Sequence, residues 1–257
     1  MIAAGKAKYR NRPYIKKLLV IAVFAVLSIL SLLICTGIGT VRFSMGEVWK
    51  ALFINDGSAA RLIVWNLRFP RILVGGFVGI CLALSGCILQ GVMRNTMASP
   101  STIGVNGGAS FVGYLTLVVF PSYSYLLPIG SIIGAFVTTM LIYALAYQRG
   151  VSPVKMILSG MAVSALFGAF NDMIKTFFAD ALGNASGFLV GGLNGSGWGS
   201  FQMILPYALT GIFICLFLPA KMNILMLGDE TANSLGLRTE RFRFFLIAVS
   251  SLLAGAA

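Results

Sequence analysis

Long apolar stretches separated by short polar segments dominate the pattern along this chain. Each stretch has about 18 residues or more, which is enough to cross a bilayer as a helix. They lack the polar–apolar alternation of a transmembrane β-barrel. The pattern therefore predicts an all-α, polytopic integral membrane protein with about seven transmembrane helices present. The predicted spans are Leu18–Thr36, Ile72–Val92, Thr102–Phe120, Tyr125–Tyr147, Val154–Phe178, Gln202–Pro219 and a segment beginning near Phe244.

The composition supports this class, because 58% of the residues are hydrophobic and 10% are charged, whereas a soluble domain has roughly 25% charged residues. Between the first two spans, Ser44–Phe53 has the pattern of a short amphipathic helix at the membrane surface. We expect residues 1–257 to form a single transmembrane domain. We also expect this domain to be incomplete, because Ser250–Ala257 has the sequence of the middle of a helix.

The net charge of +12 is distributed unevenly along the chain. Thirteen of the 19 lysines and arginines precede the first span or lie at every second boundary after it. The positive-inside rule makes these ends cytoplasmic. We therefore predict a multi-pass protein of a bacterial cell membrane with a cytoplasmic N-terminal tail (1–17) and a cytoplasmic loop (221–243). Topology accounts for the basic charge, and we expect no nucleic-acid partner. The thirteen residues are Lys6, Lys8, Arg10, Arg12, Lys16, Lys17, Arg94, Arg149, Lys155, Lys221, Arg238, Arg241 and Arg243.

The residues that several kinds of chemistry require are missing or scattered. The chain has no histidine, and its four cysteines lie in apolar segments without a C-x-x-C pair. We therefore expect no disulfide framework, metal site, cofactor or histidine-based catalysis in this chain. A G-x-x-x-x-G-K-[ST] phosphate loop is also absent from the sequence, so any ATP hydrolysis must belong to another polypeptide.

Two predicted spans carry small or polar residues at helical spacing. In the second span, Gly75, Gly79, Gly86 and Gln90 share one face, which predicts either close helix packing or the lining of a path. In the fifth span, a comparable face carries ionisable residues, which are costly inside a membrane and tend to face water or each other. There, Asp172 and Lys175 are close enough to pair. This face indicates either a translocation path or packing with an ion pair near the membrane surface. Its residues are Ser164, Gly168, Asn171, Asp172 and Lys175.

Two further segments are candidates for partner contacts. Arg68 and Arg71 flank Pro70 on the predicted outer side, where positive charge is uncommon. We expect Pro70 to end a loop and to hold both guanidinium groups at a helix start, facing either an acidic partner surface or lipid phosphates. The second segment is predicted to form a short cytoplasmic helix from Thr231 to Leu235, flanked by glycines. It is either a coupling element for another subunit or an inert loop. The candidate coupling residues are Leu227, Gly228, Asp229, Glu230, Ala232, Leu235 and Gly236.

Several motifs, in order along nearly the whole chain, resemble those of FecCD-type permeases, the membrane subunits of ABC importers for iron-siderophore complexes, haem and vitamin B12. The chain departs from the family at Thr96, where a proline usually follows the asparagine. A later family motif would lie beyond Ala257. The matching segments are Arg68-Phe69-Pro70-Arg71, Gly79 with Leu82-Ala83-Leu84-Ser85-Gly86 and Gln90-Gly91, Arg94-Asn95 with Ala98-Ser99-Pro100 and Ile103-Gly104-Val105, Gly107-Gly108-Ala109, and Leu227 to Gly236.

The resemblance implies a type II importer permease of roughly ten membrane helices. It implies a second permease subunit, as a homodimer or pseudo-dimer, with a path along the dimer axis that the fifth span lines. Two cytoplasmic ATPase subunits, which hold ATP and Mg²⁺, would bind Leu227–Gly236. An extracellular substrate-binding protein would dock on Arg68 and Arg71, and membrane lipid would surround the subunit.

Two other functions are compatible with a polytopic membrane protein. An ion-coupled secondary transporter of a small solute usually needs carboxylates near the midplane or broken helices, and Asp172 is the only candidate, close to a span end. A membrane-embedded enzyme would have few ligands for metal or proton chemistry. Both alternatives fit the residues less well than an ATP-driven importer subunit that is not itself an enzyme.

Overall fold

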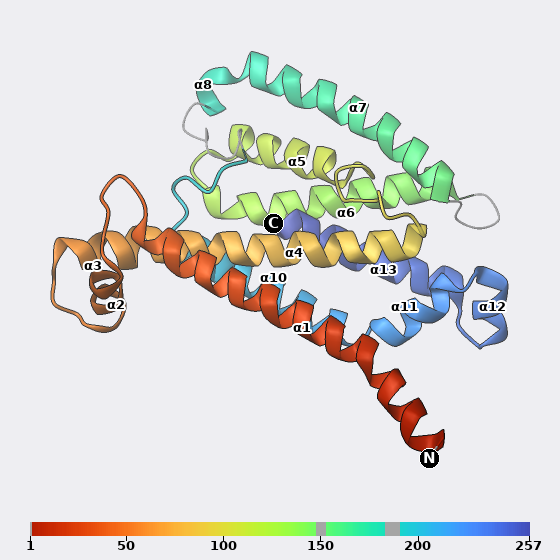
Figure 1. Cartoon of the computed structure of the whole chain (residues 1–257). Helices are drawn as coiled ribbons and strands as arrows, with labels where there is room; N and C mark the ends of the chain where they lie inside the picture. Colours follow the sequence, from red (N-terminus) through yellow and green to blue (C-terminus); the bar gives the residue numbers. More distant parts are fainter. Residues whose placement is uncertain (1, 148–152, 183–190) are drawn as a thin grey trace. The chain divides into compact units, whose positions relative to one another are not determined.

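A computed structural model of the chain describes residues 2–147, 153–182 and 191–257 (Figure 1). Arg149, one of the basic residues used to predict topology, lies outside these ranges. The contacts divide the chain into two compact units, Met1–Ile72 and Leu73–Ala257, and each unit is described by itself. The single domain expected over residues 1–257 stays a prediction.

Unit 1 (Met1–Ile72) is helical. It contains α1 (Ile2–Gly37), α2 (Met45–Phe53), α3 (Ala59–Ile63) and the π-helical turn η1 (Val64–Arg68). The short helix predicted at Ser44–Phe53 is confirmed as α2, with Ser44 as its N-cap. The Glu47 amide donates to Ser44 Oγ at 3.3 Å, and the Ser44 amide donates to Glu47 Oε2 at 2.7 Å. This reciprocal capping box fixes where the helix begins.

The structure corrects the predicted helix start around Pro70. Helical structure begins at Ala59 and continues through η1 into α4 (Phe69–Met93), giving a continuous span of 35 residues. Pro70 therefore lies inside a helix and does not end a loop. Proline has no amide hydrogen, and its ring crowds the preceding turn. The π-turn η1 ends at Arg68, two residues before Pro70, so the turn that the proline ring would crowd is wider than a regular α-helical turn.

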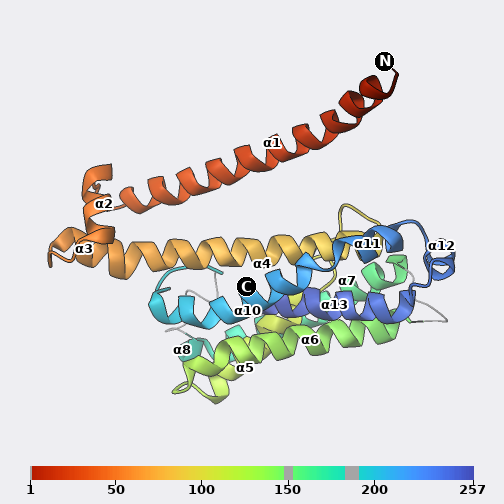
Figure 2. The ribbon, with the colours of Figure 1, turned by 90° about the horizontal axis from the view of Figure 1, so that it is seen from below.

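Unit 2 (Leu73–Ala257) continues α4 and adds the remaining helices. Figures 1 and 2 show α13 running beside α6, and α5 packs against both α6 and α7. The elements after α4 are α5 (Val105–Val119), η2 (Ser124–Leu126), α6 (Leu127–Ala146), α7 (Pro153–Phe177), α8 (Ala179–Leu182), α10 (Trp198–Leu216), α11 (Pro219–Met226), α12 (Asp229–Ser234) and α13 (Thr239–Ala256).

Most predicted spans correspond to helices of membrane length. Among the described residues, five helices are long and apolar enough to cross a membrane, and α5 is a shorter apolar helix. The span predicted at Thr102–Phe120 begins later, at Val105, because the Ser99 and Thr102 side chains close a hydrogen-bonded turn before it. The seventh predicted span lies in α13. This helix starts at Thr239, so charged residues occupy its first turns.

Small residues allow α5 and α6 to approach closely. A Cβ added at Gly108 would overlap the Thr138 side chain, and one added at Gly134 would lie 2.8 Å from Val112 Cβ. Thr138 is almost fully buried. Contact between helix backbones is a main source of helix association in lipid, where neighbouring helices gain little from the hydrophobic effect. The glycine spacing on α4 predicted either close packing or a path lining there, and no sequence pattern marked the α5–α6 contact.

A buried pair of serines joins α4 to α13. Ser85 Oγ lies 2.8 Å from both the carbonyl oxygen and the Oγ of Ser250, and Ser250 Oγ also lies 3.2 Å from the Ser85 carbonyl oxygen. Both serines are completely buried. A hydroxyl in such surroundings is stabilised only if it has a partner, so this pair fixes the register between the two helices.

The α5–α6 contact leads to a stability prediction. Replacing Gly108 with leucine should lower the free energy of unfolding by about 3 kcal/mol or more, because Thr138 and the α6 backbone leave no space for a side chain. Thermal unfolding of the detergent-purified chain measures this. The matched control is Gly76→Ala, where an added Cβ meets no atom within 4 Å. Equal unfolding temperatures for the two variants would contradict the close packing.

Candidate functional site: a cavity and a glycine-flanked loop in unit 2

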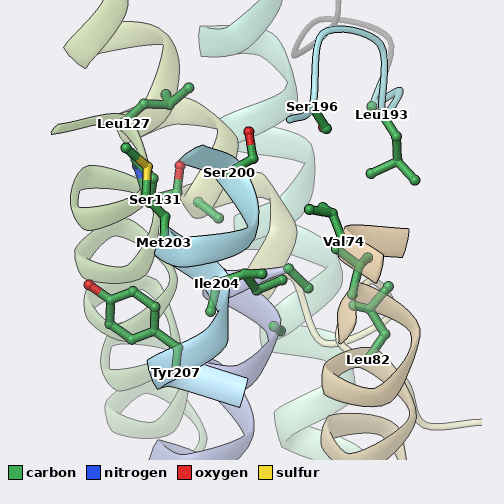
Figure 3. A pocket seen from close by; sticks show the side chains of 18 of the residues that line it. Val74, Leu82, Leu127, Ser131, Leu193, Ser196, Ser200, Met203, Ile204 and Tyr207 are labelled. Carbon is green, nitrogen blue, oxygen red and sulfur yellow. The ribbon is translucent and has the colours of Figure 1, made fainter. Parts of the chain in front are cut away.

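Unit 2 contains a cavity of about 960 Å³ lined by α4, α5, α6, α10, the end of α13 and the loop before α10. In Figure 3, Val74 and Leu82 of α4 form one wall, while Leu127 of α6 and Met203 and Tyr207 of α10 form the other. The lining contains both apolar and neutral polar side chains, and none of the described lining residues is charged. The cavity can therefore accommodate a bulky molecule without binding it through ion pairs. The polar lining residues include Asn106, Ser110, Ser131, Ser196 and Ser200.

None of these polar cavity residues was predicted from the sequence. Ser131 is 8% exposed, and its hydroxyl has no hydrogen-bond partner among the described residues. Single hydroxyls are common in apolar helices, where they usually bond the carbonyl four residues earlier. No spacing pattern marks this set, because its members come from α5, α6, α10 and a loop and meet only in the folded unit.

The residues predicted to line a path on α7 lie away from this cavity. Ser164 contributes instead to a smaller cavity of about 600 Å³ beside the turn at residues 95–102. Asn171 is buried, and its Nδ2 donates to the Gly107 carbonyl oxygen at 3.3 Å, linking α7 to α5. Gly168 has no atom within 4 Å of an added Cβ. The path role of this α7 face stays a prediction.

The predicted ion pair on α7 is present. Lys175 Nζ lies 3.4 Å from Asp172 Oδ1, and the Asp172 side chain is 79% exposed. The ammonium group also lies 5.3 Å from the centre of the Tyr114 ring. Ion-coupled transporters usually use carboxylates held near the membrane midplane or broken helices there. An exposed, paired Asp172 is poorly suited to that role.

The glycine face of α4 has few neighbours within unit 2. A Cβ at Gly75 would lie 2.9 Å from Leu193, but Gly79 and Gly86 have nothing within 4 Å, and Gln90 is exposed. The buried face of α4 instead carries Cys81, Ser85, Ile88, Leu89 and Val92. Helix packing through Gly79, Gly86 and Gln90 stays a prediction, and it requires a neighbour outside unit 2.

In unit 1, Arg68 is bound to the end of α1. Its Nη1 donates to the carbonyl oxygens of Thr36 at 3.1 Å and Gly37 at 3.2 Å, and its Nη2 donates to that of Val41. The guanidinium lies 5.1 Å from the centre of the Phe43 ring. The C-terminal end of a helix carries partial negative charge and unpaired carbonyls, which favour a cation. The carbonyl oxygens at and just after the end of α1 thus face Arg68 with partial negative charge, whereas we expected an acidic partner surface or lipid phosphates to do so.

Arg71 differs from Arg68 in its surroundings. It is exposed, and it has no hydrogen bond or ion pair with any other described residue. A docking role for both arginines stays a prediction, but Arg71 has the guanidinium that a partner can reach without breaking a helix cap.

The candidate coupling segment forms a short helix between two glycines. The helix α12 extends from Asp229 to Ser234, slightly earlier than predicted, and its flanking residues Gly228 and Gly236 have φ values of 114° and 83°. Residues that carry a side chain rarely adopt such backbone φ values, so glycine is favoured at both positions. Ala232 is buried, whereas Leu227 and Leu235 are 62% and 59% exposed. The segment thus presents two exposed leucines beside a helix whose first turn is acidic.

Asp229 is the electrostatic centre of this segment. Its Oδ1 accepts a hydrogen bond from Arg94 Nη2 and lies 2.8 Å from Arg243 Nη2. Partial burial by itself would raise the pKa of Asp229, but the hydrogen bonds and charges of Arg243 and Arg94 outweigh it and lower the pKa below its usual value. The carboxylate is therefore ionised at neutral pH.

Comparison with known proteins relates the chain to one family, because residues 25–257 match the FecCD transport family. The chain belongs to the FecCD transport family. It is 33% identical over 246 residues to the Fe(3+)-citrate import system permease protein YfmD of Bacillus subtilis, covering 94% of this chain and 72% of that protein. It is 36% identical over 224 residues to the cobalamin import system permease protein BtuC of Halobacterium salinarum, covering 83% of this chain and 60% of that protein.

A solved structure supports the same relation. It is described as a metal-chelate type ABC transporter in an inward-facing conformation, with a TM-score of 0.78 and 28% identity over 92% of this chain and 74% of that chain. This FecCD protein is thus a multi-pass membrane permease subunit of the ABC importer type, and it is not itself an ATPase. Membership implies ATPase and binding-protein partners.

The position of Arg68 in this FecCD protein leads to a testable difference between the two arginines. Arg68→Lys should lower the free energy of unfolding by about 1–2 kcal/mol, because lysine cannot bond several carbonyls with a planar fork. Arg71→Lys should leave stability unchanged. Thermal unfolding of both purified variants tests the difference, and a stable Arg68→Lys protein would show that the cap contributes nothing.

Proposed function

We propose that this chain is the permease subunit of an ATP-driven importer for iron-siderophore complexes, haem or cobalamin. The observation that carries the proposal is the apolar surface around α12, presented by a membrane domain of the FecCD family. Met226, Leu227 and Leu235 are each more than half exposed there. A short helix of this kind can be held in a groove of another subunit, and the family relation indicates that this subunit is an ATPase.

The charge distribution supports a cytoplasmic position for α12 and for the N-terminus. Basic residues surround the segment, including Lys221, Arg238 and Arg241, as the positive-inside rule requires for short cytoplasmic loops. The helix α4 has Arg71 near its N-terminal end and Arg94 directly after its C-terminal end. Because a spanning helix puts its two ends on opposite faces of the membrane, Arg71 is then extracellular and available to a substrate-binding protein.

The uncharged cavity supports a cargo that is bulky and carries its own polar groups. Conduction requires interactions that are favourable enough for entry and weak enough for release. Neutral hydroxyls and apolar side chains meet this requirement for a metal chelate whose metal is already wrapped by its ligand. The family relatives named for ferric citrate and cobalamin import are consistent with this class of cargo. A second permease subunit, in a homodimer or pseudo-dimer, completes the proposed assembly.

A substitution in the coupling surface tests the ATPase contact. Leu227→Glu should reduce co-purification of the ATPase, and the hydrolysis it supports, by about tenfold or more, because a charge replaces a central apolar contact. Leu227→Met is the matched control, since it keeps an apolar side chain of similar volume. If Leu227→Glu retains full ATPase binding, α12 is not the contact.

A substitution at the other end of α4 tests docking. Arg71→Glu should abolish uptake of the transported chelate in cells while membrane insertion stays normal, because it sets like charges against an acidic docking surface. Arg71→Lys should retain most uptake. Uptake of radiolabelled ferric citrate, haem and cobalamin by cells producing the complete transporter would also identify the cargo. Normal uptake by Arg71→Glu would refute the docking role.

A further inference from the structure

Asp229 and the two arginines that bind its carboxylate together link the helices α4, α11, α12 and α13. Arg94 follows α4, donates to the Leu225 carbonyl oxygen at the end of α11 at 3.0 Å, and also binds Asp229, the first residue of α12. On α13, Arg243 binds the same carboxylate oxygen at 2.8 Å. The Asp229 side chain, at the start of α12, therefore binds an arginine that directly follows α4 and another in the first turns of α13.

The network extends to a further helix. Arg243 Nη1 lies 3.9 Å from Glu240 Oε1, and the Tyr143 hydroxyl of α6 lies 3.5 Å from Glu240 Oε2. The helices α4, α6 and α13 also line the large cavity with residues toward their other ends, among them Val74, Ser131 and Ala254. The network thus connects α12 with three helices that form the cavity wall.

Two features show that the Asp229 contacts constrain the protein. Arg243 is 2% exposed although it is charged, and a buried charge is stable only when it is paired. Arg94 has a φ of 48°, a left-handed conformation that a helix end normally assigns to glycine. The Asn95 amide bonds the Gln90 carbonyl oxygen at 3.2 Å, which completes this helix end. The chain therefore has arginine where glycine would fit the backbone better, and that arginine reaches Asp229.

We propose that Arg94, Asp229 and Arg243 are positioning residues that transmit the movement of α12 to the cavity-lining helices α4, α6 and α13. This inference rests on the proposed function, since α12 must contact an ATPase. It assigns to Asp229 an internal role, so that the ATPase holds the apolar residues around α12 while Asp229 connects them to the membrane domain.

The test uses the full transporter in proteoliposomes, with the ATPase that co-purifies with the wild-type chain. A cysteine reporter at Ser200, which lines the cavity, is introduced after replacing the four native cysteines with alanine. The rate at which a hydrophilic maleimide labels the reporter is measured with and without ATP and vanadate. In the wild-type network we expect this rate to change by about fivefold or more.

Arg94→Gly, Asp229→Asn and Arg243→Gln should each bind the ATPase normally but lose the ATP-dependent change in labelling. Arg94→Gly is the most informative variant, because it supplies the residue that the backbone favours and removes the arginine side chain with its bonds to Leu225 and Asp229. Glycine relieves the left-handed backbone, whereas loss of the arginine removes its bonds to Leu225 and Asp229. The two effects oppose each other, so its unfolding temperature should stay close to that of the wild type, which excludes misfolding as the cause. The double variant Arg94→Gly with Asp229→Asn should behave like Asp229→Asn alone, since both changes break the same contact between Arg94 and Asp229.

The matched control is Arg241→Gln, because Arg241 lies on α13 two residues before Arg243 and is exposed. It should respond like the wild type. The inference is overturned if the three network variants keep the ATP-dependent change in labelling, or if the wild-type protein shows no such change. It is also overturned if Asp229→Asn no longer binds the ATPase, because Asp229 would then be a direct contact. Failure of the wild-type chain to retain any ATPase would instead overturn the proposed function, which makes the two failures distinguishable.

Discussion

Carbonyl groups at the C-terminal ends of helices must find donors, and within the described ranges of this protein arginine side chains supply them at three such ends. Arg61 donates to the carbonyl oxygens of Ala51 and Ile54 at the end of α2, at 2.7 and 3.0 Å. Arg68 does the same for α1, and Arg94 for α11. Each guanidinium can bond more than one oxygen and also favours the negative end of the helix dipole. These caps determine where the helices end and hence how the loops between them are held.

This use of arginine alters the functional reading of the charged positions. A positive residue in a predicted outer segment suggests a partner, yet Arg61 and Arg68 are bound by unit 1 itself. Arg71, with an exposed guanidinium, is the residue that remains accessible for docking. In unit 2, Arg94 combines both roles, because it caps α11 and also binds the first residue of the proposed coupling helix. The same residue type therefore serves helix termination at one position and communication between elements at another.

Small residues show a similar division. At Gly108 and Gly134 the absence of a side chain is required, because α5 and α6 approach until a Cβ would overlap the neighbouring helix. At Gly79 and Gly86 no such neighbour is present within unit 2. The glycine spacing on α4 and the close approach of α5 and α6 look alike in sequence. Only the position of the facing helix separates a packing glycine from one on an open surface.

The sequence by itself determined the membrane class, the approximate positions of the long helices, the short helix at Ser44–Phe53 and the glycine-flanked segment around α12. These follow from local length, apolar content and helix-end residues, which act over a few turns. Only the tertiary structure decided that Pro70 lies within a helix and that Arg68 caps α1. It also decided that hydroxyl groups from separate elements meet in one cavity. It also brought Arg94 and Arg243 to Asp229, at sequence separations of 135 and 14 residues. Such contacts depend on which helices pack together, and side-chain spacing along one helix carries no information about its neighbour.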